Sequence, residues 1–282
     1  MASSTSRVAI QKSIKEITTM ITIKKYTTIA RVSLSNAIAY RATLFSRFCF
    51  YALFIYVFVN LWRAIYQEGS VFGYSYIQIV WYLILTELIA FACGTDILNR
   101  MNEDVRSGAI AYQIGRPMHY VFYQLSTSLG QIALNLVGFG ALAVILGFIF
   151  VGQLYTFSII NLPLILLSIF TGILLNYFFL MLIGLSSFIM EDNLAIYLLF
   201  RNLTFMLGMF LPVEFLPGWL QPIAKSLPFS YVYWAPAKLF VDFSPALFME
   251  LFPRQIFWTA LIGILVMFSY RISIRRLSIN GG

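Results

Sequence analysis

The sequence predicts an all-α integral membrane protein with six transmembrane helices. Two observations lead to this prediction. Of the 282 residues, 60% are hydrophobic and only 11% are charged, whereas a soluble domain carries about 25% charged residues. Apolar runs of roughly 18 residues or more recur along most of the chain, and as a helix each can cross a hydrocarbon core of about 30 Å. The composition therefore excludes a soluble globular protein.

The N-terminal segment, residues 1–44, is predicted to lie at the membrane interface. Within residues 1–23 an apolar stripe recurs at helical spacing, which is typical of an amphipathic helix; the stripe is Ile10, Ile14, Ile17 and Ile21. A weaker pattern of the same kind runs from Lys24 to Leu44, and we expect it to lie along the membrane surface. The alternative is a basic tail that only helps to set the topology.

Residues 45–271 form the predicted membrane domain, and residues 272–282 form a basic tail. The six predicted spans share long apolar stretches with few charges, and they are placed at 45–65, 75–95, 120–150, 160–190, 194–213 and 253–271. An even number of spans puts both termini on the same side of the membrane.

Lysine and arginine gather in the N-terminal segment, in the 96–119 loop and in the basic tail. The positive-inside rule therefore places both termini in the cytoplasm of a chain in the inner (plasma) membrane. Topology and anionic lipid headgroups also explain the net charge of +8 better than nucleic acid does. We expect membrane lipids as partners, and no nucleic acid.

The loop between the second and third spans is the densest run of charge in the chain interior, "NEDVRSGAIAYQIGRPMHYVFYQ". Acidic side chains favour the positive N-terminal end of a helix, and proline ends one. We therefore expect Glu103 and Asp104 to begin a short, exposed cytoplasmic helix that stops before Pro117. Such a helix would transmit movement to the spans on either side. The alternative is a solvated turn whose charges serve only topology.

The outer segment after the fifth span is apolar but rich in proline. Each proline removes a backbone donor that lipid does not replace, and the prolines are Pro212, Pro217, Pro222, Pro228, Pro236 and Pro245. We expect short helices that lie on the outer leaflet or dip into it. Their expected interfacial anchors are the aromatic residues, namely Trp219, Tyr231, Tyr233 and Trp234.

Two charged residues fall inside predicted spans, where charge is costly. Glu87 and Arg201 lie about nine residues from the expected cytoplasmic ends of their spans, which puts both near a depth of about 13 Å. Matched depth permits an ion pair between the second and fifth spans, and this pair is our hypothesis. The alternatives are an Arg201 side chain that reaches to the interface and a proton-relay role for Glu87.

The sequence offers little chemistry of its own. His119 is the single histidine, and we expect no metal site, because no Cys, His, Asp and Glu cluster has ligand spacing. A phosphate-binding loop and a paired nucleophile and base are also missing from the sequence. We therefore expect no catalytic residues and no cofactor on this chain, which disfavours a membrane-bound enzyme acting on lipid.

Two stretches resemble the permease subunits of ABC-2 type transporters. The first follows the second span and matches the family pattern at Asp104, Gly108, Ile110 and Pro117, with Ile114 where the family has leucine. The second follows the fifth span and matches at Pro212, Pro217, Trp219, Leu220, Gln221, Leu227 and Pro228. One position departs from the pattern, since Val105 stands where the family often has arginine.

This resemblance implies a half-transporter. Two six-span permeases, identical or related, would form the pathway, and two separate cytoplasmic ATPase subunits would hold ATP and Mg²⁺. The loop after the second span would be a coupling helix touching the ATPase, and the outer helices would cap the route. The implied coupling residues are Asp104, Arg106, Gly108, Ile110, Tyr112, Gln113 and Pro117. The implied outer gate contains Pro212, Glu214, Pro217, Trp219, Gln221 and Pro228.

The cargo class follows from the composition of the spans. Their aromatic side chains and few charges favour export of a hydrophobic or amphipathic substrate. The competing function is a secondary transporter or channel that works without an ATPase. Such proteins usually show internal repeats and paired broken helices, and neither is evident in the sequence.

Overall fold

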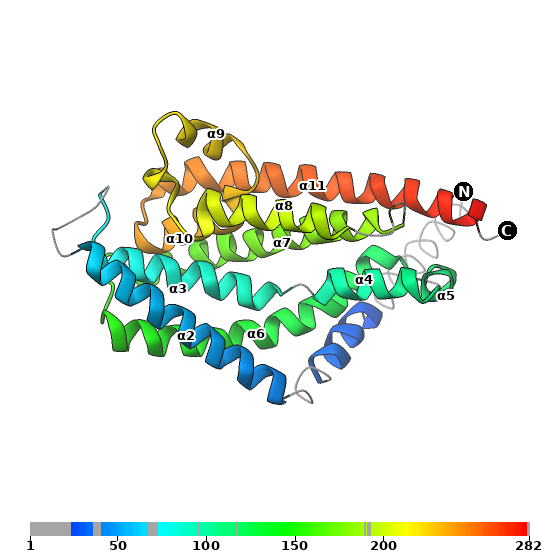
Figure 1. Ribbon diagram of the computed structural model, residues 1–282, viewed down its shortest axis with the longest axis horizontal. Helices are drawn as coiled ribbons and strands as arrows, with labels where there is room; N and C mark the ends of the chain where they lie inside the picture. Colours follow the sequence, from blue (N-terminus) through cyan, green and yellow to red (C-terminus); the bar gives the residue numbers. More distant parts are fainter. Residues whose placement is uncertain are drawn as a thin grey trace, which may run out of the picture.

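The computed structural model describes residues 24–35, 41–66, 73–94, 96–116, 118–188, 190 and 193–280, and the regular elements in this part of the chain are helices (Figure 1). The amphipathic helix predicted within residues 1–23 lies outside the described residues, as does Pro117.

Five described helical stretches are long and apolar enough to cross a membrane. They are built on α2 (Arg41–Ile65), α3 (Tyr76–Cys93), α6 (Tyr120–Phe150), α7 (Leu162–Ser186) and α11 (Pro245–Asn280). These helices run along the long axis of the molecule (Figure 1). They confirm five of the six predicted spans, although α11 begins eight residues before the predicted 253–271 span and continues beyond it.

The predicted fifth span, 194–213, is a shorter helix than expected. Helix α8 (Leu194–Thr204) continues into a π-helical turn, η3 (Phe205–Met209), and ends there. At 1.5 Å per residue these 16 residues reach about 24 Å. The chain breaks at Gly208, whose φ of +142° excludes other residues, and an added Cβ would lie 2.5 Å from the Cβ of Trp234. The close approach of Trp234 therefore fixes the end of this helix.

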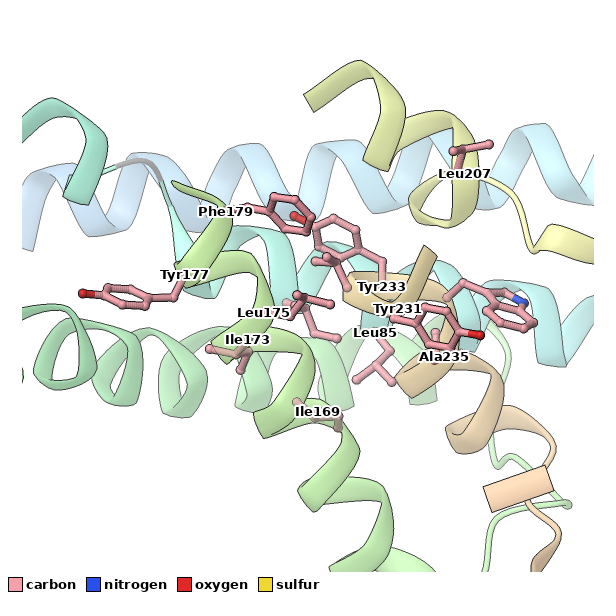
Figure 2. Packing of buried hydrophobic residues seen from close by; sticks show 14 of the residues in the cluster. Leu85, Ile169, Ile173, Leu175, Tyr177, Phe179, Leu207, Tyr231, Tyr233 and Ala235 are labelled. Carbon is pink, nitrogen blue, oxygen red and sulfur yellow. The ribbon is translucent and has the colours of Figure 1, made fainter. Parts of the chain in front are cut away.

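The outer segment folds into three short helices, η4 (Val213–Phe215), α9 (Leu220–Ser226) and α10 (Ser230–Val241). Helix α10 lies inside the bundle, and Figure 2 shows its buried Tyr231, Tyr233 and Ala235 among residues of α3 and α7. The prediction that Tyr231, Tyr233 and Trp234 are interfacial anchors is wrong, because all three are buried in the protein. Of the predicted anchors only Trp219 is exposed. Aromatic composition alone did not distinguish a protein-facing helix from a lipid-facing one.

Pro236 lies within α10, so the Val232 carbonyl loses its usual helical hydrogen bond. Helix α7 packs against this position through Gly172, where an added Cβ would lie 2.7 Å from the Val232 oxygen. Gln255 of α11 then joins the three helices. Its Nε2 donates to the carbonyls of Ser168 and Tyr231, both at 3.0 Å, and its Oε1 accepts from the Ser168 hydroxyl at 2.8 Å. The proline is therefore accommodated because neighbouring helices surround it.

The helix at residues 24–35 packs along α6. The Ser33 hydroxyl donates to the Thr127 carbonyl at 2.7 Å, and the rings of Tyr26 and Phe122 meet edge to face. Gly130 of α6 makes room for this helix, because an added Cβ would overlap the Ala30 carbonyl. The second amphipathic pattern is thus confirmed as a helix for residues 24–35, and its apolar face is turned toward α6. Residues 36–40 lie outside the described residues, and Leu44 belongs to α2.

We predict that Gly130→Val destabilises the protein, because the added side chain must push the 24–35 helix away from α6. Overpacking of this kind costs about 1–3 kcal/mol. A thermal unfolding midpoint several degrees below that of the unchanged chain is expected in detergent, together with faster proteolytic loss of the N-terminal segment. Gly140→Val on the same helix is the matched control, since an added Cβ there meets nothing within 4 Å. Equal midpoints for the two variants would contradict this packing.

Candidate functional site: the α4–α5 corner and the outer cap

The second span is continued by a separate helix across a break at Gly94. Helix α3 ends at Cys93, and α4 (Asp96–Arg106) begins after Gly94, whose φ is +57°. The end of α3 is satisfied by side chains, since Arg47 Nη2 donates to the Phe91 carbonyl at 2.6 Å and Asn135 Nδ2 donates to the Ala92 carbonyl at 3.1 Å. A cation at a helix C-terminus is electrostatically favourable. The break is therefore a built feature of the bundle.

The predicted start of the cytoplasmic helix is wrong. Glu103 and Asp104 lie near the C-terminal end of α4, which begins at Asp96. The physical reason is an apolar face of α4, formed by Ile97, Leu98 and Met101, which is buried against the bundle. The chain then turns at Gly108, with a φ of +72°, into a second short helix, α5 (Ala109–Gly115). The expected single helix is thus a corner of two helices at one end of the molecule (Figure 1).

Polar side chains brace α4 against α6. Asp104 accepts hydrogen bonds from the Tyr120 hydroxyl at 2.9 Å and from Gln124 Nε2 at 3.3 Å. Arg100 of α4 donates to Gln124 Oε1 at 3.4 Å and to the Ser128 hydroxyl at 2.8 Å. Asp104 was predicted to couple to a partner protein, but its carboxylate is engaged inside the chain. Hydrogen bonds to a charged group contribute about 1.5–3 kcal/mol each, so this brace holds α4 firmly.

A second contact ties α4 to the chain just before α8. The amides of Asn102 and Asn193 exchange two hydrogen bonds, at 3.1 and 2.9 Å. Asn193 also donates to the Ile183 carbonyl near the end of α7, at 3.1 Å. Asn193 immediately precedes α8. The corner is therefore joined to α6, α7 and the start of α8, and sequence reasoning missed both asparagines because nothing in their spacing signals the pairing.

Helix α5 has one buried and one exposed face. Ile110 is 2% exposed and anchors the helix, so it does not belong to the outward surface on which it was predicted. Tyr112 is 69% exposed, and the Arg116 guanidinium lies 4.6 Å from the centre of its ring. Arg106 and Gly108 are also exposed, while Gln113 is half-buried. The outward surface therefore consists of Arg106, Gly108 and Tyr112, and the half-buried Arg116, which the prediction missed, lies against the Tyr112 ring one helical turn further on.

The hypothesised Glu87–Arg201 ion pair does not form. Glu87 is 2% exposed and its Oε1 has no hydrogen-bond partner in the described chain. Arg201 is exposed, with its guanidinium 6.0 Å from the centre of the Tyr197 ring. The ion pairs found among the described residues are Lys238–Asp242 and Arg254–Glu250. Equal depth was a sound inference from spacing, but spacing along a helix does not fix which neighbour the side chain faces.

Glu214 organises the outer cap, which consists of η4, α9 and α10 with the residues joining them. Its carboxylate accepts from the Tyr74 hydroxyl at 3.0 Å and from Trp234 Nε1 at 3.1 Å. Gln221 Nε2 donates to the carbonyls of Glu214 and Leu216, at 3.1 and 2.9 Å. Among the predicted gate residues, Pro212 precedes η4, the Pro217 carbonyl begins α9, and the Pro228 carbonyl begins α10. The predicted residues therefore do gather in one structure.

An apolar cleft of about 500 Å³ lies between α7, α8 and α11. Its walls include Phe179, Phe200 and Phe229, whose rings pack together. The polar residues among those lining it are Ser186, Ser269 and Ser273. The cleft therefore suits an apolar group.

Comparison with known proteins decides the family. A protein-family model described as ABC-2 family transporter protein matches residues 50–281, which cover α3 to α11 and most of α2. The chain belongs to the ABC-2 transporter family. A search of curated proteins finds no match. The ABC-2 assignment makes this chain a multi-pass membrane protein and a permease, which is a transport subunit and not itself a catalyst.

We predict that Asp104→Ala and Tyr120→Phe destabilise the ABC-2 permease through the same contact. Each is expected to cost about 1–3 kcal/mol, because each removes the hydrogen bond that the Tyr120 hydroxyl donates to the Asp104 carboxylate. Thermal unfolding midpoints of both single variants and the double variant form a cycle, and the double variant should lose clearly less than the sum. Glu103→Ala, an exposed acid next to Asp104, is the control and should change little. Additive losses would show that Asp104 does not brace α4 through Tyr120.

We also predict that Glu214→Ala loosens the outer cap. Tyr74 and Trp234 lose their shared acceptor, which should cost about 1–3 kcal/mol and lower the thermal unfolding midpoint. Glu250→Ala serves as the control, because its ion pair with Arg254 is exposed on both sides and is worth about 0–1 kcal/mol. The role assigned to Glu214 fails if both variants unfold at the same temperature.

Proposed function

We propose that this permease is one half of an exporter in the inner (plasma) membrane. Two permeases, identical or related, would form the pathway, and separate cytoplasmic ATPase subunits would bind ATP and Mg²⁺ and drive transport. The observation that carries the proposal is the α4–α5 corner. It is braced to α6, α7 and the start of α8, yet it presents Tyr112 to the outside at 69% exposure.

The corner suits the transmission of movement because its inner and outer sides differ. Ile110 and the apolar face of α4 are buried, so α5 and α4 share an apolar attachment to the bundle. Asp104 and Asn102 add directional hydrogen bonds to α6 and to Asn193. A push on α5 therefore reaches α6 and α8 through bonds with defined geometry.

The exposed side of the corner has a definite chemistry. Tyr112 is an exposed aromatic side chain with the half-buried Arg116 guanidinium against its ring, and Arg106 is a second, exposed cation on the same corner. Tyrosine and arginine are the residue types that most often carry binding energy at protein interfaces. We expect the ATPase to meet them with an apolar pocket that has an acidic rim, because opposite charge at the rim speeds association.

The proposed topology follows from the ends of the bundle. The α4–α5 corner and the C-terminal end of α11 lie at one end, and the outer cap lies at the other (Figure 1). With the corner in the cytoplasm, the C-terminal end of α11 lies there too, and the basic residues of the N-terminal segment favour the same side for that segment. Helices α8 and η3 then act as the sixth crossing, completed on the outer side by the cap.

The cleft between α7, α8 and α11 supports a hydrophobic or amphipathic cargo. Its volume of about 500 Å³ falls in the range of small-molecule sites, and its walls are almost entirely apolar. Helix α8 is short, passes into η3 after Thr204, and is linked to the corner through Asn193. A movement of α5 would therefore reach the wall of this cleft, and this link connects the ATPase surface to the cargo.

We predict that Tyr112→Ala weakens binding of the cytoplasmic ATPase. Removal of a central exposed aromatic residue typically costs about 2 kcal/mol or more, which is roughly a thirtyfold rise in Kd. The measurement is recovery of the ATPase with a tagged permease in mild detergent, followed by titration. Tyr155→Ala is the matched control, because Tyr155 is even more exposed than Tyr112, at 84%, but lies in the loop after α6.

The same experiment tests the function itself. An unchanged permease that recovers no ATPase under any mild condition would contradict the proposal and favour a secondary transporter or channel. Unchanged ATPase recovery with Tyr112→Ala would instead place the coupling surface elsewhere on the chain.

A further inference from the structure

A long apolar groove of about 830 Å³ lies between α6, α7 and α11. It is separate from the cleft at α8, because α6 forms one wall and α8 contributes none of the lining residues found. Along α11 the lining residues run from Ile256 to Arg271, a distance of about 22 Å at 1.5 Å per residue. The hydrocarbon core of a bilayer is about 30 Å thick, so the groove is longer than one leaflet is deep.

The interior of the groove offers hydrocarbon and almost no polar groups. Two threonines line it, but each turns its hydroxyl to its own helix. Thr171 donates to the Leu167 carbonyl at 2.8 Å, and Thr259 donates to the Gln255 carbonyl at 2.7 Å. At Gly263 an added Cβ would lie 3.0 Å from the Phe178 ring, so the glycine lets this ring pack closely on α11, and a larger side chain there would push the ring into the groove or enter the groove itself. The groove therefore fits flexible apolar chains along its length.

One end of the groove is positively charged. Arg271 is the charged residue among the described residues that line it, and it is exposed and forms no ion pair with them. The pKa of the His119 imidazole is lowered, mainly by burial and to a smaller extent by the positive charge of Arg271. His119 is therefore mostly neutral at pH 7, and Arg271 supplies the charge. In the proposed topology this end of α11 lies at the cytoplasmic face.

The groove is complementary to an anionic phospholipid. Its hydrocarbon walls match the acyl chains, and the cation at its interfacial end matches the phosphate. We propose that it binds an anionic phospholipid of the cytoplasmic leaflet, with the acyl chains between α6, α7 and α11 and the phosphate at Arg271. A second copy of this chain would also cover apolar walls, since α2 and α6 carry exposed apolar side chains, but the cation at Arg271 favours an anionic occupant. The lipid would hold α11 and α6 together at the end where the 24–35 helix packs on α6.

The test compares phosphatidylglycerol with phosphatidylcholine carrying the same acyl chains, each added back to the delipidated full-length chain. Native mass spectrometry counts the bound lipid, and the thermal unfolding midpoint gives an independent reading. We expect a preference of about fivefold for phosphatidylglycerol, which corresponds to one basic residue at a membrane surface. Equal retention of the two lipids by the unchanged protein would overturn the proposal, whatever the variants do.

Two variants locate the site. Arg271→Gln should abolish the preference while leaving retention of phosphatidylcholine unchanged, and Gly263→Leu should reduce retention of both lipids by filling the groove. Arg106→Gln, an exposed arginine at the same end, and Gly140→Leu, a helical glycine facing open space, are the matched controls. A preference that survives Arg271→Gln, or retention that survives Gly263→Leu, would contradict the assignment.

Two further outcomes separate this lipid from other occupants. Glycerol phosphate added in excess should not displace the bound phosphatidylglycerol, because the acyl chains hold it; displacement would show a free-anion site instead. Gly263→Leu should leave the oligomeric state unchanged. A shift toward monomers in that variant would show that the groove is an interface between copies of the chain.

Discussion

A single buried glutamine, Gln255, connects the outer half of the bundle. It contributes donors to α7 and α10 and an acceptor to Ser168, and it has no exposed surface. In a hydrocarbon environment an unpaired backbone carbonyl costs several kcal/mol. The hydrogen bond from Gln255 to the Tyr231 carbonyl therefore helps to hold α10, the short helix that contains Pro236, inside the bundle. Because α10 is enclosed, its Trp234 donates to Glu214 of η4 within the cap and packs closely on Gly208 of η3.

The two ends of the molecule are built on different principles. The outer cap is held by hydrogen bonds between side chains and loops around Glu214, which close it over the bundle. The opposite corner uses charge, since Asp104 and Arg100 secure α4 while Arg106 stays outside. The protein thus directs one set of charges inward for stability and another outward for contact. Fixed inner bonds make the outer surface of the corner rigid.

Composition and the length of the apolar runs predicted much of the fold, because the thickness of the hydrocarbon core sets how many apolar residues a helix needs to cross a bilayer. Five long helices and the short outer helices followed from it. The errors have a common origin: helical spacing does not give the rotation of a helix about its axis, and it does not give the residues of other helices that a side chain meets. Helical spacing placed Glu87 and Arg201 at one depth, yet Arg201 faces outward. Asp104 was recognised as important from its motif, but whether its carboxylate points inward depends on Tyr120 and Gln124, which lie on another helix.

The order in which the helices are made gives the Gln255 contact a further meaning. The ribosome synthesises α10 before α11. The carbonyl of Tyr231 and the side chain of Ser168 therefore lack their hydrogen-bond partner, Gln255, until α11 has been synthesised. Until then α10 packs against α3 and α7 without the hydrogen bond that Gln255 supplies. Membrane insertion of the outer half is therefore completed late, from the C-terminal end of the chain. A permease truncated before α11 would lack Gln255 and its hydrogen bonds to α7 and α10. We expect such an incomplete bundle to be recognised by membrane-protein quality control.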